Sequence, residues 1–164
     1  MKSTGEVMGV GQSFAEAFVK SQLAAGVRLP KGGKAFLSVR NADKAKMIEV
    51  ARALSNLGFA LVATKGTAAA IAQAGLKVQP VNKVQEGRPH IVDMLKNREI
   101  SLIVNTVEED RRSIKDSWSI RNSALQNKIT YYTTISGARA ACLGMAHLQE
   151  LRPYSIQSLH KSLP

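Results

Sequence analysis

Short apolar runs alternate with segments of helical periodicity along most of this chain, and this alternation restricts the fold more than any other feature. The apolar runs predict five strands, at residues 34–39, 59–63, 76–81, 100–104 and 130–134. Apolar residues at helical spacing predict helices at residues 43–57, 68–74, 90–97, 113–126 and 136–150. Strands that alternate with helices form parallel sheets covered on both faces. We therefore predict a three-layer α/β/α domain around a five-stranded parallel sheet.

A further helix is predicted ahead of the first strand. Ser13 and Glu16 have the spacing of a capping box, and apolar residues follow on one face up to about residue 25. Glycine and proline at residues 26–33 then predict a linker. The chain therefore divides into residues 1–33 and a strand–helix domain at residues 34–164, and the short first helix must dock on another surface.

The net charge is strongly positive, +11 from 23 Lys and Arg against 12 Asp and Glu. A field of this sign attracts anions, which include nucleic acids, phosphorylated metabolites and acidic proteins. Aromatic residues make up only 5% of the chain, so few side chains are available to stack on the bases of a single-stranded nucleic acid. No apolar run has the ~20 residues that cross a bilayer. The single cysteine, Cys142, excludes an intramolecular disulfide and a cysteine-based metal site, and it fits a reducing cytoplasm.

Phosphate-binding groups follow the first three predicted strands. Ligands of open parallel sheets bind at the carboxyl ends of the strands. Thr64 and Thr67 present hydroxyls there, and Gly66 lets an anion approach the backbone where the next helix points its free amides. Lys44 lies in the first turn of a helix, where a cation gains nothing from the dipole, and Lys83 follows the third strand. These groups predict a phosphate site.

Polar groups suited to a sugar or a base complete this edge of the sheet. Ser38 ends the first strand, and Asn105 and Thr106 follow the fourth with an amide and a hydroxyl. Each group also has a structural interpretation: Thr67 as a helix cap, Ser38 as a partner of its own backbone, and the lysines as solvated surface groups. Walker and Rossmann fingerprints are absent from the sequence. The prediction therefore depends on four loops converging at one edge.

Groups suited to catalysis are sparse. The sequence contains no HExxH, CxxC or GxSxG pattern and no acid–base pair that stands out. His90 lies at a predicted helix start, and His147 and His160 lie late in the chain. Cys142 belongs to an alanine-rich helix, where we expect it to be packed. We predict no catalytic residue and no metal ligand in this chain.

Several motifs resemble those of carbamoyl-phosphate synthase large chains. The runs KSTGEVMG at residues 2–9 and SFAEAF at residues 13–18 resemble the end of the second ATP-grasp half of that enzyme. Three other runs resemble its carboxy-terminal regulatory domain: ATKGTA at residues 63–68, VNKVQEGRPH at 81–90 and RNSALQ at 121–126. The resemblance covers nearly the whole chain.

The resemblance implies a methylglyoxal-synthase-like fold for residues 34–164. It implies that residues 1–33 are the tail of an ATP-grasp domain plus a linker, and we expect them to be poorly anchored or to dock on a neighbouring molecule. The full-length enzyme of such a family is a cytoplasmic ligase of pyrimidine and arginine biosynthesis. It makes carbamoyl phosphate from glutamine-derived ammonia, bicarbonate and two ATP.

For partners, the resemblance implies a small glutaminase chain and self-association of large chains, with neither nucleic acid nor a membrane. ATP, Mg and K ions would belong to the catalytic halves, and we expect no cofactor and no catalysis in this fragment. The regulatory domain would bind UMP as an inhibitor, IMP at the same place, and ornithine as an activator at the border with the ATP-grasp half.

The effector residues of the family carry over to positions at the predicted strand ends. They are Ser38, Lys44, Thr64, Thr67, Lys83 and Asn105, and Thr106 adjoins the last of them. Val107 stands where the family has a hydroxyl, and the loop at residues 107–112 is one residue longer than the enteric pattern. The ornithine-side residues carry over to Tyr131 and Thr133. Most ornithine ligands would lie outside this chain, so we expect it to bind little ornithine alone.

Two other functions remain open at this point. Methylglyoxal synthase shares the fold and the phosphate loops, but it carries a Gly-Pro-Leu-Gly-Gly-Asp-like stretch with an aspartate base after the third strand. The corresponding stretch here, residues 82–89, has Glu86 as its only carboxylate. The charge of +11 prompts the second alternative, a basic module that binds nucleic acid.

Overall fold

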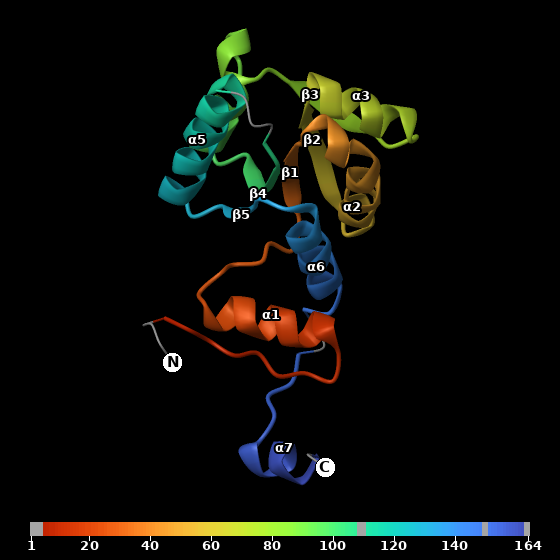
Figure 1. Cartoon of the computed structure of the whole chain (residues 1–164), viewed down its shortest axis with the longest axis vertical. Helices are drawn as coiled ribbons and strands as arrows, with labels where there is room; N and C mark the ends of the chain where they lie inside the picture. Colours follow the sequence, from red (N-terminus) through yellow and green to blue (C-terminus); the bar gives the residue numbers. More distant parts are fainter. Residues whose placement is uncertain (1–4, 108–110, 149–150, 163–164) are drawn as a thin grey trace.

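The computed structural model describes residues 5–107, 111–148 and 151–162, and its centre is a five-stranded sheet (Figure 1). The strands are β1 (Gly33–Ser38), β2 (Phe59–Thr64), β3 (Val78–Val81), β4 (Ile100–Asn105) and β5 (Thr130–Tyr132). All neighbouring strands are parallel, in the order β3-β2-β1-β4-β5. The predicted five-stranded parallel sheet is therefore confirmed.

Helices cover both faces of this sheet. They are α2 (Lys44–Asn56), α3 (Lys65–Gln73), α4 (Ile91–Lys96), α5 (Arg111–Gln126) and α6 (Ile135–Ala146). The core on one face joins the sheet to α2, α3 and α6, and the core on the other face joins it to α4 and α5. The three-layer α/β/α prediction is confirmed.

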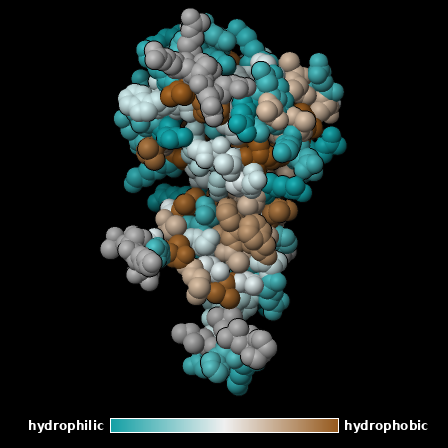
Figure 2. Space-filling view, viewed as in Figure 1, coloured by the Kyte–Doolittle hydropathy of each residue, from teal (hydrophilic) through white to brown (hydrophobic). Residues whose placement is uncertain are grey.

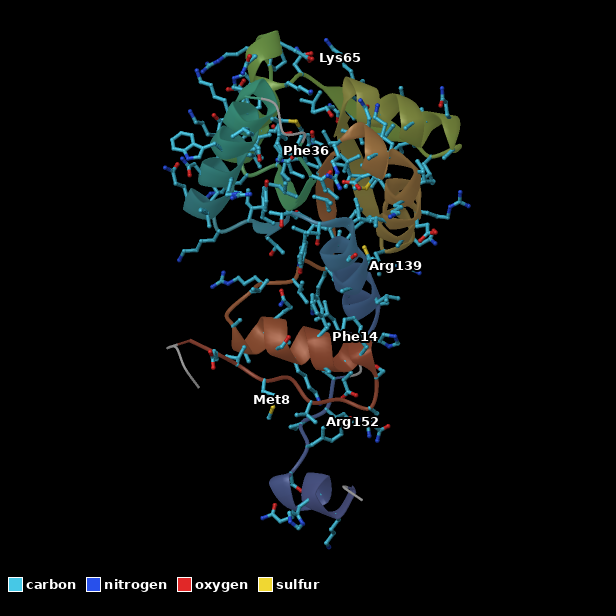
Figure 3. The ribbon with its side chains drawn as sticks, viewed as in Figure 1. Met8, Phe14, Phe36, Lys65, Arg139 and Arg152 are labelled. Atoms are coloured by element: carbon cyan, nitrogen blue, oxygen red, sulfur yellow. The ribbon has the colours of Figure 1, made fainter. Side chains whose placement is uncertain are left out.

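Strand β1 shows why the sequence carries continuous apolar runs instead of an alternating pattern. The side chain of Phe36 belongs to the core under α4 and α5, and Figure 3 shows it in the interior. Its neighbours Ala35 and Leu37 belong to the opposite core. All three are fully buried, because a central parallel strand is covered on both faces.

Two helices begin differently from the prediction. Asp43, the first residue of the predicted helix, instead ends a 3-10 turn (Asn41–Asp43) that precedes α2, and its carboxylate accepts a hydrogen bond from Arg40 Nε at 2.7 Å. Helix α3 begins at Lys65, directly after β2, with Thr64 in the N-cap position. The helix therefore starts three residues before the predicted start at residue 68, which brings its first-turn amides to the end of the strand.

The chain around β5 also differs. The strand ends at Tyr132, because Thr134 is the N-cap of α6 and its hydroxyl accepts a hydrogen bond from the amide of Gly137 at 3.0 Å. Helix α6 ends at Ala146, and a short helix, α7 (Ile156–Ser162), follows in the region that had no prediction.

The expectation that residues 1–33 are poorly anchored is wrong for the part that the structure describes. Helix α1 (Phe14–Ala24) packs on α6, and Val19 is fully buried in the core that α6 shares. Gly144 makes this approach possible, because a Cβ at that position would clash with Val19. A contact more than a hundred residues away in the sequence thus supplies the surface that the isolated helix lacks.

The segment between α6 and α7 contacts α1 through Tyr154. Glu16 accepts a hydrogen bond from Tyr154 at 2.8 Å and pairs with Lys20 at 2.8 Å. Lys20 Nζ also lies 3.7 Å from the centroid of the Tyr154 ring. These contacts hold the segment that leads to α7 against the outer side of α1 (Figure 1).

Apolar side chains remain exposed around α1. Met8 is 84% exposed and Phe14 is 68% exposed, and the Met8 side chain points away from α1 in Figure 3. Figure 2 shows apolar residues gathered in the middle of the molecule, where α1 meets α6. None of the described helices has the length and apolar character needed to cross a membrane.

Candidate functional site

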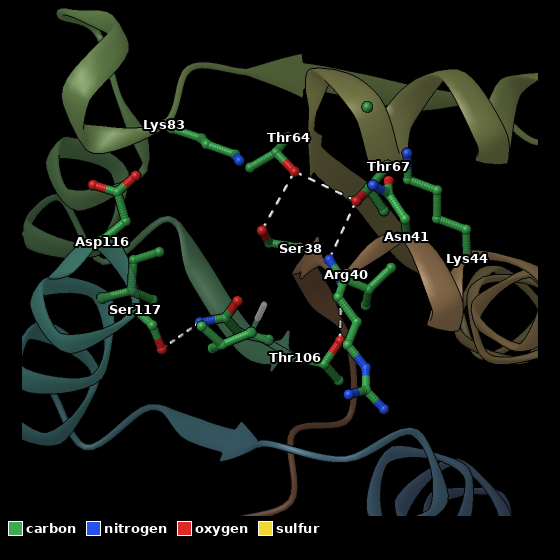
Figure 4. A pocket seen from close by; sticks show the side chains of 15 residues that line it. Ser38, Arg40, Asn41, Lys44, Thr64, Thr67, Lys83, Thr106, Asp116 and Ser117 are labelled. Carbon is green, nitrogen blue, oxygen red and sulfur yellow. Dashed lines mark hydrogen bonds between the residues drawn. The ribbon is translucent and has the colours of Figure 1, made fainter. Parts of the chain in front are cut away.

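A pocket of about 180 Å³ opens at the carboxyl ends of the strands (Figure 4). The effector residues predicted from the sequence all lie on its wall: Ser38, Lys44, Thr64, Thr67, Lys83, Asn105 and Thr106. They come from β1, α2, β2, α3, β4 and the loops that follow β3 and β4, so the topology brings these separate segments to one place.

Three hydroxyls converge at the floor of the pocket. Thr64 Oγ1 lies 3.3 Å from Ser38 Oγ and 3.4 Å from Thr67 Oγ1, both within hydrogen-bonding distance. Thr67 also accepts a hydrogen bond from the backbone amide of Val39 at 3.2 Å, and it lies inside α3 instead of capping it. Because α3 has no side-chain cap, its first-turn amides are free to bind an anion beside these hydroxyls.

Two lysines reach this corner from opposite sides. Figure 4 shows Lys83 extending from the loop after β3 and Lys44 rising from the first turn of α2. A Cβ at Gly66 would lie 3.3 Å from Lys44 Nζ, so the glycine leaves room for the ammonium group at the start of α3. Two cations, free amides and hydroxyls around one corner form a binding site for a phosphate.

The wall opposite the phosphate corner carries acceptors. Asn105 is buried at the end of β4, and its Nδ2 donates to Ser117 Oγ at 3.0 Å and to Tyr131 Oη at 3.0 Å. Asp116 adds a carboxylate from the first half of α5. Val107, where the resemblance places a missing hydroxyl, and Ile120 make part of the pocket wall apolar.

Thr106 orders the rim of the pocket. Its hydroxyl accepts a hydrogen bond from the backbone amide of Arg40 at 3.1 Å, and its own amide donates to the Ser38 carbonyl at 3.0 Å. The hydrogen bond from Arg40, and to a lesser degree one from Thr106, hold the pKa of the Asp43 carboxyl below its usual value against the opposing effect of burial. Thr106 therefore joins the loops after β1 and β4.

Four residues with polar or charged side chains on the wall were not predicted as site residues. Arg40 and Asn41 lie between Ser38 and Lys44 in the sequence, so the strand-end rule that located those two residues also covers them. Asp116 and Ser117 come from α5, which no strand-end rule identifies. Only the helical spacing that turns Ser117 and Ile120 inward could have indicated that this helix lines the pocket.

The two ornithine-side residues occupy different surroundings. Tyr131 bonds Asn105, and its ring lies 5.6 Å from Arg121 Cζ. Tyr131 also lines a second cavity of about 410 Å³, between α5, β5 and the linker, whose described wall has the cations Arg28 and Lys128 and no carboxylate. Thr133 is exposed just past β5 and lines neither cavity.

The remaining candidates for chemistry lie outside the pocket. Cys142 is buried in α6, and burial raises the pKa of its thiol to about 12, which fits a packed residue. His90 is buried at the start of α4, with Nδ1 3.2 Å from the Asp93 carboxylate. Within the described residues, no group of three or more His, Cys, Asp or Glu could hold a metal. Residues 108–110 of the loop that follows Val107 lie outside the described residues.

Comparisons with known proteins agree with this architecture. A family model described as the MGS-like domain matches residues 46–133. Carbamoyl phosphate synthase large chains from Ralstonia nicotianae, Pseudomonas putida and Neisseria meningitidis serogroup A are 60%, 57% and 53% identical over 163 residues. These alignments cover 99% of this chain and 15% of each relative, so the chain spans about 15% of their length.

A solved structure has the same fold at low sequence identity. Methylglyoxal synthase from Elizabethkingia anophelis NUHP1 superposes with a TM-score of 0.57 at 16% identity. The match covers 83% of this chain and 95% of that protein. The predicted methylglyoxal-synthase-like fold is therefore confirmed.

Proposed function

This chain belongs to the MGS-like domain family, and we propose that it is the carboxy-terminal regulatory domain of a carbamoyl-phosphate synthase large chain. In this proposal the strand-end pocket binds a nucleoside monophosphate, UMP or IMP, as an allosteric effector. One observation carries the proposal: Lys44, Lys83 and the hydroxyls at the start of α3 converge at one corner, opposite the acceptors Asn105 and Asp116.

The phosphate would bind at the first turn of α3. The free amides there and the hydroxyls of Thr64 and Thr67 supply donors, and Lys44 and Lys83 supply charge. Hydrogen bonds from charged donors are about twice as strong as neutral ones, so this corner would contribute most of the affinity.

The sugar and base would face the opposite wall. A carboxylate accepts hydrogen bonds from vicinal hydroxyls, so Asp116 is suited to a ribose, while Val107 and Ile120 offer apolar contact to a base. A free phosphate would use only the first corner. The proposal therefore places the discrimination between nucleotides and smaller phosphates at Asn105 and Asp116.

The proposal extends to the rest of the protein through the relatives. Carbamoyl phosphate synthase large chains match this chain over only 15% of their length, so the ligase chemistry, with its ATP, Mg and K sites, would lie in other parts of a longer protein. The exposed Met8 and Phe14 around α1 support contact with such parts. A small glutaminase chain and other large chains would be its protein partners.

An ornithine site is proposed at the border marked by Tyr131 and Thr133. The cation-lined second cavity offers an ornithine ammonium group no carboxylate among its described residues. The acidic ligands would therefore come from the adjoining part of the longer protein, and we expect this chain alone to bind little ornithine.

Isothermal titration calorimetry tests the nucleotide proposal directly. The protein is titrated with UMP, with IMP and with ornithine in separate experiments at low and moderate salt. We expect saturable binding of at least one nucleotide and weak or absent binding of ornithine. Failure of both nucleotides to bind at millimolar concentration would contradict the proposal.

The same protein sample tests the two alternatives. For a methylglyoxal synthase, Glu86 would be the base after β3, but it pairs with Lys65 at 3.5 Å and accepts from the Lys83 amide at 3.1 Å, outside the pocket wall. We expect no consumption of dihydroxyacetone phosphate. We also expect no retention of duplex or single-stranded DNA at moderate salt, where sequence-independent binding is weakened.

A further inference from the structure

The side-chain amide of Asn105 is fixed by two partners that lie far from it in the sequence. Its Nδ2 donates one hydrogen bond to Ser117 Oγ and another to Tyr131 Oη, each at 3.0 Å. Figure 4 marks the bond to Ser117 with a dashed line. An amide nitrogen carries two hydrogens, so these partners use its full donor capacity.

The oxygen of this amide, Asn105 Oδ1, is not used by these two contacts. Asn105 lines the pocket, and its Oδ1 accepts no hydrogen bond from the described residues. An amide that rotates by half a turn would present a donor instead of an acceptor. Both partners are hydroxyls, which donate as well as accept, so they hold the plane of the Asn105 amide in either orientation.

Tyr131 is itself held in place from two directions. It belongs to β5, which pairs with β4 so that Ile103 and Tyr131 are register partners. The Arg121 guanidinium lies 5.6 Å from the centroid of its ring, within the range of a cation–π contact. The hydroxyl that reaches Asn105 therefore projects from a strand and a stacked ring, which leaves it little freedom to move.

We propose that Tyr131, assisted by Ser117, is a positioning residue that holds the Asn105 side-chain amide in place at the pocket wall opposite α3. The site then binds phosphorylated ligands that place a polar group against this amide more tightly than it binds phosphate alone. This inference rests on the proposed nucleotide binding, and it specifies how the pocket wall opposite α3 contacts the part of the ligand beyond the phosphate.

The experiment compares Tyr131→Phe with a matched control on the same strand. Tyr132 is the adjacent tyrosine, but its hydroxyl lies 3.5 Å from Gln22 Oε1 on the opposite face, so Tyr132→Phe removes the same atom away from the pocket. Binding of UMP and of inorganic phosphate to each variant is followed by NMR, using backbone amides of α3. The side-chain NH₂ signals of Asn105 are recorded without ligand.

We expect Tyr131→Phe to weaken UMP binding by roughly two- to tenfold, the range for a neutral hydrogen bond, and to leave phosphate binding unchanged. The Asn105 NH₂ signals should shift in this variant and not in Tyr132→Phe. Ser117→Ala should act in the same direction. A purely structural role for Tyr131 would change both affinities together.

Three results would separate the two proposals. Unchanged Asn105 signals in Tyr131→Phe would overturn the positioning role, whatever the ligand does. Equal losses for UMP and phosphate, or no loss for either, would also overturn it. Failure of the wild-type protein to bind UMP would contradict the proposed function, and the Asn105 signals would then decide the positioning role alone.

Discussion

Lys83 is the residue whose side chain should contribute most to binding of an anion. It enters the pocket from the loop after β3, opposite Lys44 (Figure 4). A hydrogen bond to a charged partner is worth about 1.5–3 kcal/mol. We expect Lys83→Ala to weaken nucleotide binding roughly ten- to hundredfold in calorimetry. Lys77→Ala removes the same charge from an exposed position outside the pocket and should change affinity little; equal losses in both variants would point to net charge alone.

The strand-end residues could be predicted because parallel topology leaves few alternatives. Once Ser38, Thr64 and Asn105 are placed at the ends of parallel strands, they must lie at one edge of the sheet. The roles of Ser117 and Tyr131 could not be predicted, because their bonds to Asn105 span 12 and 26 residues and depend on how α5 and β5 pack. No local sequence pattern indicates contacts between residues that lie so far apart in the chain.

At the scale of secondary-structure elements, the docking of α1 on α6 depends on one glycine. A Cβ at Gly144 would clash with the buried Val19. We expect Gly144→Ala to reduce the free energy of unfolding by about 1–3 kcal/mol, the usual effect of overpacking, measured by chemical denaturation. Gly32→Ala is a matched control, because a Cβ there meets nothing within 4 Å.

A double variant tests whether that loss comes from this contact. Val19→Ala removes the methyl groups that the new Cβ would meet, although it costs stability by itself. We expect the pair Val19→Ala and Gly144→Ala to be less destabilising than the sum of the single changes. Strict additivity would show that α1 does not pack on α6 in solution as it does here.

The contact between α1 and the segment after α6 should depend on pH. The hydrogen bonds from Lys20, then Tyr154, lower the pKa of Glu16 from 4.5 to about 2. A depressed pKa stabilises the folded arrangement above the unfolded value, so this stabilisation is complete above about pH 4.5 and is lost as the pH falls toward 2. NMR shifts of the α1 amides should change in that window.

Glu16→Gln is the control for the pH experiment. It removes the titrating group, so the α1 shifts should lose their dependence on pH between about 4.5 and 2 while the sheet signals stay as in the wild type. An unchanged pH response in Glu16→Gln would assign the titration to another group.

The order of strands and helices was predictable, whereas the position of α1 was not. Strand–helix alternation determines the layers with few exceptions. Helix α1 has only a short apolar face, and its contact on α6 includes Gly144, which has no feature in the sequence that marks it as a docking position. Helix boundaries shifted where hydrogen bonds to side chains intervened, as at Asp43 and Thr134.

For the whole molecule, the charge of +11 gains a specific interpretation. Two of its cations, Lys44 and Lys83, face the hydroxyls and free amides at the start of α3. At 0.1 M salt the Debye length is about 10 Å, and the attraction between an exposed charge and a ligand weakens as the salt concentration rises. We therefore expect nucleotide affinity to fall with ionic strength while binding stays saturable.

The central claim is that the pocket at the strand ends binds a nucleoside monophosphate with its phosphate at α3. A crystal structure of this chain with UMP tests it most directly. We predict the phosphate within hydrogen-bonding distance of Thr64, Thr67 and Lys83, and the sugar and base turned toward Asn105 and Asp116. UMP bound in the second cavity beside Arg28 and Lys128, or with its phosphate at Asp116, would contradict the account.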